Sequence, residues 1–172
     1  MNEPDNNWAR EQFEILDGGW ARLMAVVDAV GLEGLEQPLT PAWTIKEMLA
    51  HLAFWEETSV PVIQVIHRGG PSLPVELWYG GTDLELLPNA PWPHADIHNE
   101  REARWARSRS AAEVLERLKQ ARQKLKTILA TVTDEESRGE IGGQWSGEAV
   151  CQHVDHNLAQ IKSIAATTPR ST

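Results

Sequence analysis

Two histidines occupy matching places in two stretches of the chain that are similar to each other. One stretch reads AWTIKEMLAHLAF from Ala42, and the other reads QWSGEAVCQHVDH from Gln144. In each, a Trp precedes a hydroxyl residue that can cap a helix, and a His follows the Trp by eight residues. His51 and His153 are therefore predicted to lie ~10 Å beyond the start of their helices, at a rise of ~1.5 Å per residue. They share one layer of a bundle if both helices begin at the same end.

Helical geometry adds Asn157 to these two histidines. At ~100° per residue, His153 and Asn157 lie on one inward flank of their helix, whereas His156 points toward solvent. His51 lies on the flank of the apolar stripe of its own helix. Imidazole nitrogens bind first-row divalent ions, and an open coordination position would allow Lewis-acid or metal-water chemistry. The alternative interpretation is that His51 and His153 are partly buried histidines, each hydrogen-bonded to its neighbours.

Three further residues could take part in chemistry. Glu56 faces inward beyond Trp55, where it would serve as a ligand or general base, or would pair with an arginine or reach solvent near a helix end. His94 and His98 have a metal-ligand spacing only if both lie in one helix, and an N-cap at Asp96 would leave His94 outside it. Cys151 lies on the other flank from His153, so we interpret it as a small core residue.

Apolar residues that recur at three- and four-residue steps predict the elements that position these side chains. Two capping boxes, Thr44 with Glu47 and Ser110 with Glu113, mark helix starts. No strand pattern competes, so the sequence predicts an all-α four-helix bundle that forms a single domain over residues 1–172. The predicted helices cover about 6–30, 44–67 with a kink at Pro61, 110–130, and a fourth from Ser146, with a further helical stretch over 96–107.

A long loop is predicted between the second and third helices, over residues 69–95. It holds nine Gly and Pro residues, together with Trp78, Tyr79 and Trp92. Loops of this length are uncommon inside compact domains and are often functional. The aromatic side chains either anchor the loop to the bundle or belong to a lid over a pocket.

Composition excludes several classes of function. The chain has 172 residues and a net charge of -9. Its acidic surface would repel nucleic-acid phosphates and anionic membranes, so neither is expected as a partner. No apolar run approaches the ~20 residues that span a bilayer, and the first residues lack the pattern of a signal peptide. A single cysteine excludes an internal disulfide, and we expect a cytoplasmic protein.

The segments around the histidines resemble a known family. WTIKEMLAHLAFWEE resembles the second helix of the DinB/YfiT-like family, and HVDHNLAQI resembles its fourth helix. Residues 99–136 are similar to its third helix and the turn that follows. The resemblance covers most of the chain. It implies a four-helix bundle, often dimeric, with a three-histidine site for nickel or zinc, and in some members a thiol-dependent transferase or isomerase activity.

Carried over by position, His51 and His153 match the first two metal ligands of that family. Asn157 stands at the third position, in the register indicated by Ile161, and its neutral amide is a poorer ligand for nickel or zinc than imidazole. The resemblance as a whole implies a divalent-metal-dependent enzyme that acts on a small molecule, either a thiol-dependent transferase or a hydrolase. The alternative is a non-catalytic bundle with a degenerate metal site that binds a small ligand or a partner.

Assembly is a further expectation. Trp8, Trp20 and Trp105 add apolar area beyond what one core consumes. Helical bundles bury such a surplus by pairing, so we expect a two-fold homodimer.

Overall fold

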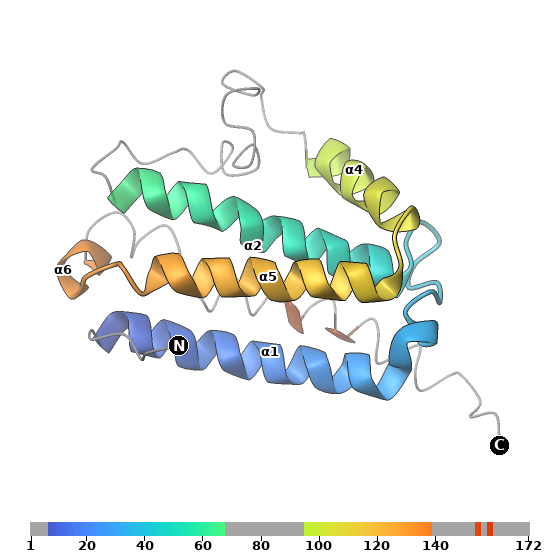
Figure 1. Ribbon diagram of the computed structural model, residues 1–172, viewed down its shortest axis with the longest axis horizontal. Helices are drawn as coiled ribbons and strands as arrows, with labels where there is room; N and C mark the ends of the chain where they lie inside the picture. The colour runs from blue at the N-terminus through green and yellow to red at the C-terminus, as the bar shows by residue number, and fades with distance from the viewer. Residues whose placement is uncertain (1–6, 68–94, 139–153, 156–157, 160–172) are drawn as a thin grey trace.

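The computed structural model describes residues 7–67, 95–138, 154–155 and 158–159 (Figure 1). The described residues form helices joined by turns, bends and irregular backbone, and the one β feature among them is an isolated bridge between Pro38 and Thr44. The prediction of an all-α fold is confirmed. The named helices are α1 (Asn7–Gly34), α2 (Ile45–His67), α4 (Ala95–Arg107), α5 (Ala111–Leu129) and the short α6 (Asp134–Ser137).

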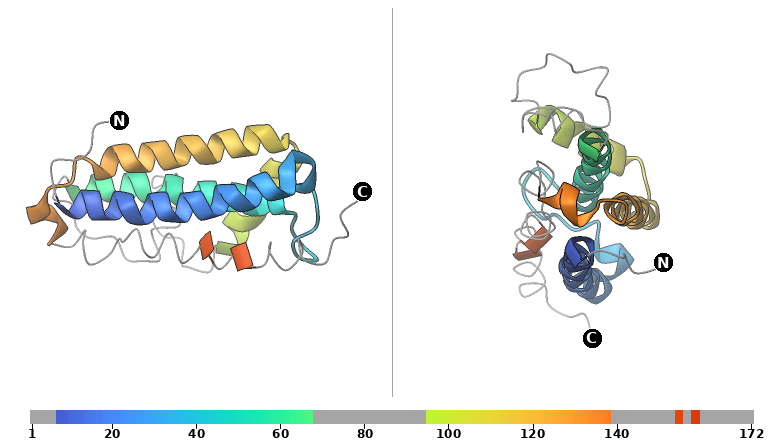
Figure 2. Two further views of the ribbon diagram at one scale, coloured as in Figure 1. Left: turned by 90° about the horizontal axis from the view of Figure 1, so that it is seen from below. Right: turned by 90° about the vertical axis from the view of Figure 1, so that its left-hand side faces the viewer.

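Three long helices lie lengthwise beside one another, with α5 between α1 and α2 in the view of Figure 1. The shorter α4 packs on α2, on the side away from α1 (Figures 1 and 2). The α6 turn closes one end of the bundle, where it contacts α1. Helix α2 is therefore covered by α5 on one side and by α4 on another.

A short piece of the C-terminal segment completes the core. Val154 and Leu158 are buried in the same apolar cluster as Leu23 of α1 and Leu49 of α2. The next residue after Val154, Asp155, accepts two hydrogen bonds from Arg22 of α1, at 2.9 Å and 2.8 Å. The described residues of this segment are helical, which agrees with the fourth helix predicted from Ser146; the rest of that helix lies outside the described residues.

Local sequence signals explain where the helices begin and bend. The capping boxes predicted at Thr44 and Ser110 are both present. Gly31 has φ 73°, a conformation that a side chain would disfavour, and it produces the bend near the end of α1. Pro61, where a kink was predicted, lies within one continuous helix, α2. The loop predicted over 69–95 lies outside the described residues except for Ala95, the first residue of α4.

The apolar core has two parts along the bundle. The larger cluster joins α1, α2, α5 and the segment around Val154, and the smaller one lies toward α6 and includes Phe13, Ile63 and Leu129. Among the described residues, no helix is long and apolar enough to cross a membrane.

Candidate functional site

His51 lies two turns into α2 and is buried, with 8% of its surface exposed. The capping box begins the helix: the Thr44 hydroxyl accepts the Glu47 N–H at 3.2 Å, and Glu47 accepts the Thr44 N–H. Trp43, just before the cap, packs against the His51 imidazole, with ring centroids 5.1 Å apart. The Trp-Thr start of α2 thus supplies both the helix cap and an aromatic ring that packs on His51.

Asn99 approaches the same imidazole from α4. Its Oδ1 lies 2.8 Å from Nδ1 of His51, which is hydrogen-bonding distance. Because a carbonyl oxygen only accepts, the contact is satisfied when Nδ1 carries the ring proton. The neutral histidine then has its basic lone pair on Nε2.

Trp55, one turn beyond His51 on α2, approaches the ring in another way. Its indole nitrogen lies 3.0 Å from both Nδ1 and Nε2, and the two ring planes are 78° apart. A donor in the imidazole plane at equal short distances from both nitrogens would clash with the carbon between them. The indole N–H therefore points at the face of the imidazole, as an N–H to π contact.

His98 lies near this group but belongs to a different contact. It is buried and stacks on Phe54 of α2, with centroids 5.4 Å apart and planes at 23°. The predicted N-cap at Asp96 is wrong, because α4 already begins at Ala95. His94, the other member of the H-x-x-x-H pair, lies outside the described residues.

The other two predicted metal ligands, His153 and Asn157, also lie outside the described residues, as does Cys151. Their neighbours Val154 and Leu158 are buried in the cluster that includes Leu49 and Leu52 of α2, on either side of His51 along the helix. Val154 and Leu158 therefore belong to the same apolar core as the part of α2 that carries His51. No group of three or more His, Cys, Asp or Glu side chains suited to a metal occurs among the described residues.

Glu56 pairs with an arginine, which is one of the roles predicted for it. Arg122 of α5 donates to both carboxylate oxygens, from Nε at 2.8 Å and from the neighbouring Nη2. Burial raises the pKa of Glu56, and the hydrogen bonds from Arg122 oppose that rise. Arg122 also donates to the Leu16 carbonyl of α1 at 2.7 Å, so this pair joins three helices. Glu56 is thus engaged on the α5 side of α2, whereas His51 meets α4.

A depression of about 340 Å³ lies on the surface beside the start of α2. Trp43 is part of its wall and also touches His51. Its charged members are bound to each other: Lys46 donates to Glu36 at 2.7 Å, and Arg107 pairs with Glu47. The depression therefore offers a small molecule the aromatic wall of Trp43 and the hydroxyl groups of Thr40 and Thr44, with little net charge, and Trp43 separates it from His51.

Sequence reasoning did not find Asn99 or Trp55 as partners of His51. Trp55 could have been found, because residues four apart share a helix face. Asn99 could not, because 48 residues separate it from His51 and no local pattern indicates how α4 packs on α2.

A sequence model described as the DinB superfamily matches residues 15–161 of the chain. No curated protein and no solved structure matches the chain.

Proposed function

Because the chain belongs to the DinB superfamily, we propose that it is a divalent-metal-dependent enzyme that uses nickel or zinc to act on a small molecule. His51 and His153 would hold the ion, with Asn157 beside them. The observation that carries the proposal is that Val154 and Leu158, which neighbour the two proposed ligands in the sequence, are buried in the same apolar cluster as Leu49 and Leu52, which flank His51 in α2.

The surroundings of His51 fit such a metal. Imidazole is a common ligand for zinc and nickel. Histidines that bind metals usually donate their second ring N–H to an oxygen of the protein, and Asn99 supplies such an oxygen at 2.8 Å. A bound ion would supply Lewis-acid catalysis. The protein's own groups would hold and shield the reactants: Trp43 and Trp55 enclose the imidazole, and the depression beside Trp43 is open to a small molecule.

A thiol-dependent transferase or a hydrolase is the reaction class that we propose. The second candidate is a non-catalytic bundle that binds a small ligand or a partner. It is favoured by one observation, the neutral amide of Asn157 where the family resemblance implies a third imidazole. Metal content measured on protein purified without a histidine tag separates the two, because only the enzyme requires an occupied site.

A calorimetric titration with nickel at neutral pH tests the ligand set. Loss of a group that hydrogen-bonds to a metal ligand typically weakens metal binding by roughly 10- to 100-fold. His51→Ala removes a ligand itself, so it should weaken nickel binding by more than that. Asn157→His should tighten binding, because it adds a third nitrogen on the same flank as His153. That gain should shrink below about pH 6, where protons compete for imidazole.

His156→Ala is the matched control, because the helical register points His156 away from that flank. It should bind nickel as the parent does. Equal affinity of the parent and Asn157→His would contradict the register, and an unchanged affinity in His51→Ala would contradict the site itself.

A further inference from the structure

We infer that Asn99 is a positioning residue for His51: its side-chain oxygen keeps the imidazole proton on Nδ1 and so places the basic lone pair on Nε2. The functional meaning of this inference rests on the proposed metal site. The contact between the two side chains does not depend on that site.

Asn99 and His51 meet through a short side-chain contact between two helices. Asn99 belongs to α4 and His51 to α2, and the side-chain atoms Oδ1 and Nδ1 are 2.8 Å apart. The imidazole is buried, so water cannot readily replace this acceptor. A buried ring N–H that loses its acceptor is costly, and the neutral ring therefore keeps its proton where the acceptor lies.

Trp55 also donates toward the imidazole. Its N–H is equally close to both ring nitrogens, at 3.0 Å, and points at the ring face. A contact with the face does not select between the two nitrogens. The Asn99 oxygen, in contrast, lies at Nδ1 alone and so favours the proton on that nitrogen.

A histidine ligates a metal through the nitrogen that lacks a proton, and the hydrogen bond at the other nitrogen decides which one that is. Trp43 packs against the imidazole and limits its rotation. Asn99 would thus determine both the orientation of the ring and the atom that binds.

Nitrogen-15 NMR of histidine-labelled, metal-free protein at about pH 8 reads the tautomer directly. His51 in the parent should show a protonated Nδ1 and an unprotonated Nε2. Asn99→Ala should shift the population toward the tautomer protonated on Nε2, which an isolated neutral histidine side chain favours in water. Asn99→Asp keeps an acceptor oxygen and should retain the parent tautomer, and Trp55→Phe should retain it too. Arg104→Ala is the control, a substitution on the exposed side of α4.

Nickel titration of the same variants supplies the second measurement. Asn99→Ala should bind about 10- to 100-fold more weakly than the parent, and Asn99→Asp should recover most of that loss. An Nε2-protonated His51 in the parent, or an unchanged tautomer in Asn99→Ala, would overturn the inference whether or not nickel binds. A third outcome separates the two proposals. If Asn99→Ala changes the His51 tautomer but His51→Ala leaves the nickel affinity unchanged, the positioning role is supported and the proposed metal site is overturned.

Discussion

Glu56 and Arg122 form a charged pair whose side chains are only 2% and 6% exposed. Burying charges is costly unless each is paired and hydrogen-bonded, and both conditions are met here. Arg122 donates to Glu56 and to the Leu16 carbonyl, and its guanidinium lies 5.4 Å from the centre of the Trp20 ring. Each partner is therefore satisfied only while α1, α2 and α5 keep their present positions.

Removing one partner of this pair should be far more damaging than removing both. Glu56→Gln leaves the Arg122 charge without its counter-ion, and we expect the free energy of unfolding to fall by about 3–5 kcal/mol. Replacing both residues by Met should recover most of that loss, because no buried charge remains. Urea unfolding monitored by circular dichroism measures these differences.

Arg22 and Asp155 provide the matched comparison. They also form a two-point arginine–carboxylate contact, but their side chains are 49% and 45% exposed. Arg22→Met should therefore lower the free energy of unfolding by only ~0–1 kcal/mol. Equal losses in Arg22→Met and Glu56→Gln would show that burial does not govern the strength of these contacts.

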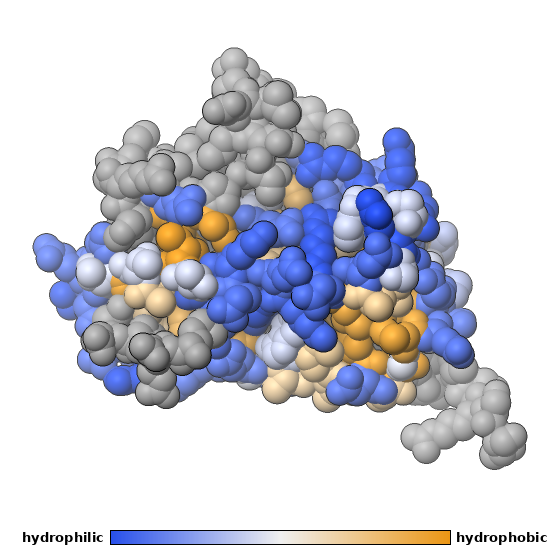
Figure 3. All heavy atoms as spheres, viewed as in Figure 1, coloured by the Kyte–Doolittle hydropathy of each residue, from blue (hydrophilic) through white to orange (hydrophobic). Residues whose placement is uncertain are grey.

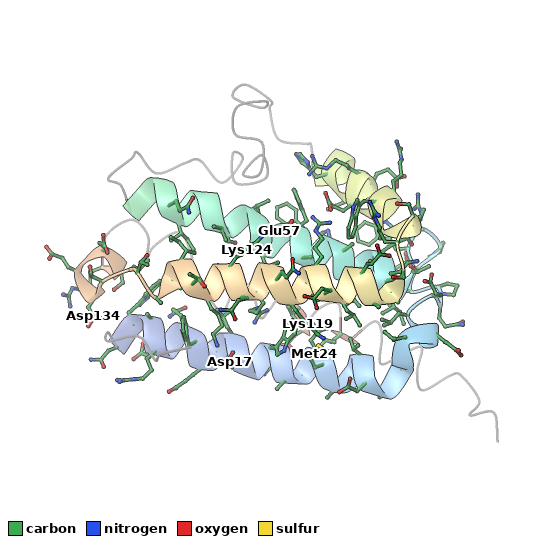
Figure 4. The ribbon with its side chains drawn as sticks, viewed as in Figure 1. Asp17, Met24, Glu57, Lys119, Lys124 and Asp134 are labelled. Carbon is green, nitrogen blue, oxygen red and sulfur yellow. The ribbon has the colours of Figure 1, made fainter. Side chains whose placement is uncertain are left out.

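At the scale of the element, helix caps define the ends of the bundle. Thr133 and Glu136 form a capping box at α6, and the same turn caps a second helix, because Asp134 accepts the Trp8 N–H of α1 at 3.0 Å. Figure 4 shows Asp134 at the end of the bundle where α6 meets the beginning of α1. Farther along α1, Asp17 accepts from Lys126 of α5 at 2.7 Å. The caps and this bridge together align the ends of α1 and α5.

The capping box of α5 should give the protein a pH-dependent stability. The backbone N–H and the hydroxyl of Ser110 donate to Glu113 and hold the pKa of its carboxyl below the ordinary value. A lowered pKa means that the stabilisation is present above the unfolded-state pKa and is lost as the pH falls through the folded-state value. The parent should therefore be more stable than Glu113→Gln at neutral pH, and the difference should vanish in acid.

Urea unfolding at a series of pH values measures this effect. Glu116→Gln, an exposed change in the same helix, is the control and should show a smaller pH dependence. A stability difference between the parent and Glu113→Gln that stays constant from neutral to acid pH would contradict the role of the carboxylate.

At the scale of the whole molecule, the question is which surface remains for a partner. The tryptophans that motivated a dimer are largely used within the chain: Trp8 packs on the smaller core cluster, Trp20 on the larger, and Trp105 lies beneath Arg117 with 4.4 Å between the guanidinium carbon and the ring centroid. Figure 3 nevertheless shows apolar surface between α2 and α5 toward one end of the molecule and between α5 and α1 toward the other, with hydrophilic surface between. Leu32 is also 53% exposed.

We still expect a two-fold homodimer, because these apolar areas would be covered by a second copy. Light scattering on a size-exclusion column at micromolar concentration should give about twice the chain mass of 19.2 kDa. Dilution should shift the mass toward that of one chain if the contact is reversible. A single-chain mass throughout the concentration series would rule the dimer out.

The sequence by itself determined the features that depend on neighbours along the chain. Helix starts at Thr44 and Ser110 were predicted correctly because a capping box is complete within four residues. The same signal occurs at Thr133, where a capping box begins α6, an element that the predicted helices did not include. Helical periodicity placed His51 only on the flank of its apolar stripe, and the structure buries it; the family resemblance is confirmed over residues 15–161. The placement of His153 and Asn157 stays a prediction.

Only the tertiary structure decided which helix faces which. Periodicity gives each helix an inner and an outer face, but it does not say which neighbour covers the inner face. The partner of His51 lies 48 residues away on α4, and the partner of Glu56 lies 66 residues away on α5. The sequence left several possibilities open for Glu56 for the same reason. A polar side chain on an inward flank must find a partner, and its identity depends on contacts between elements distant in the chain.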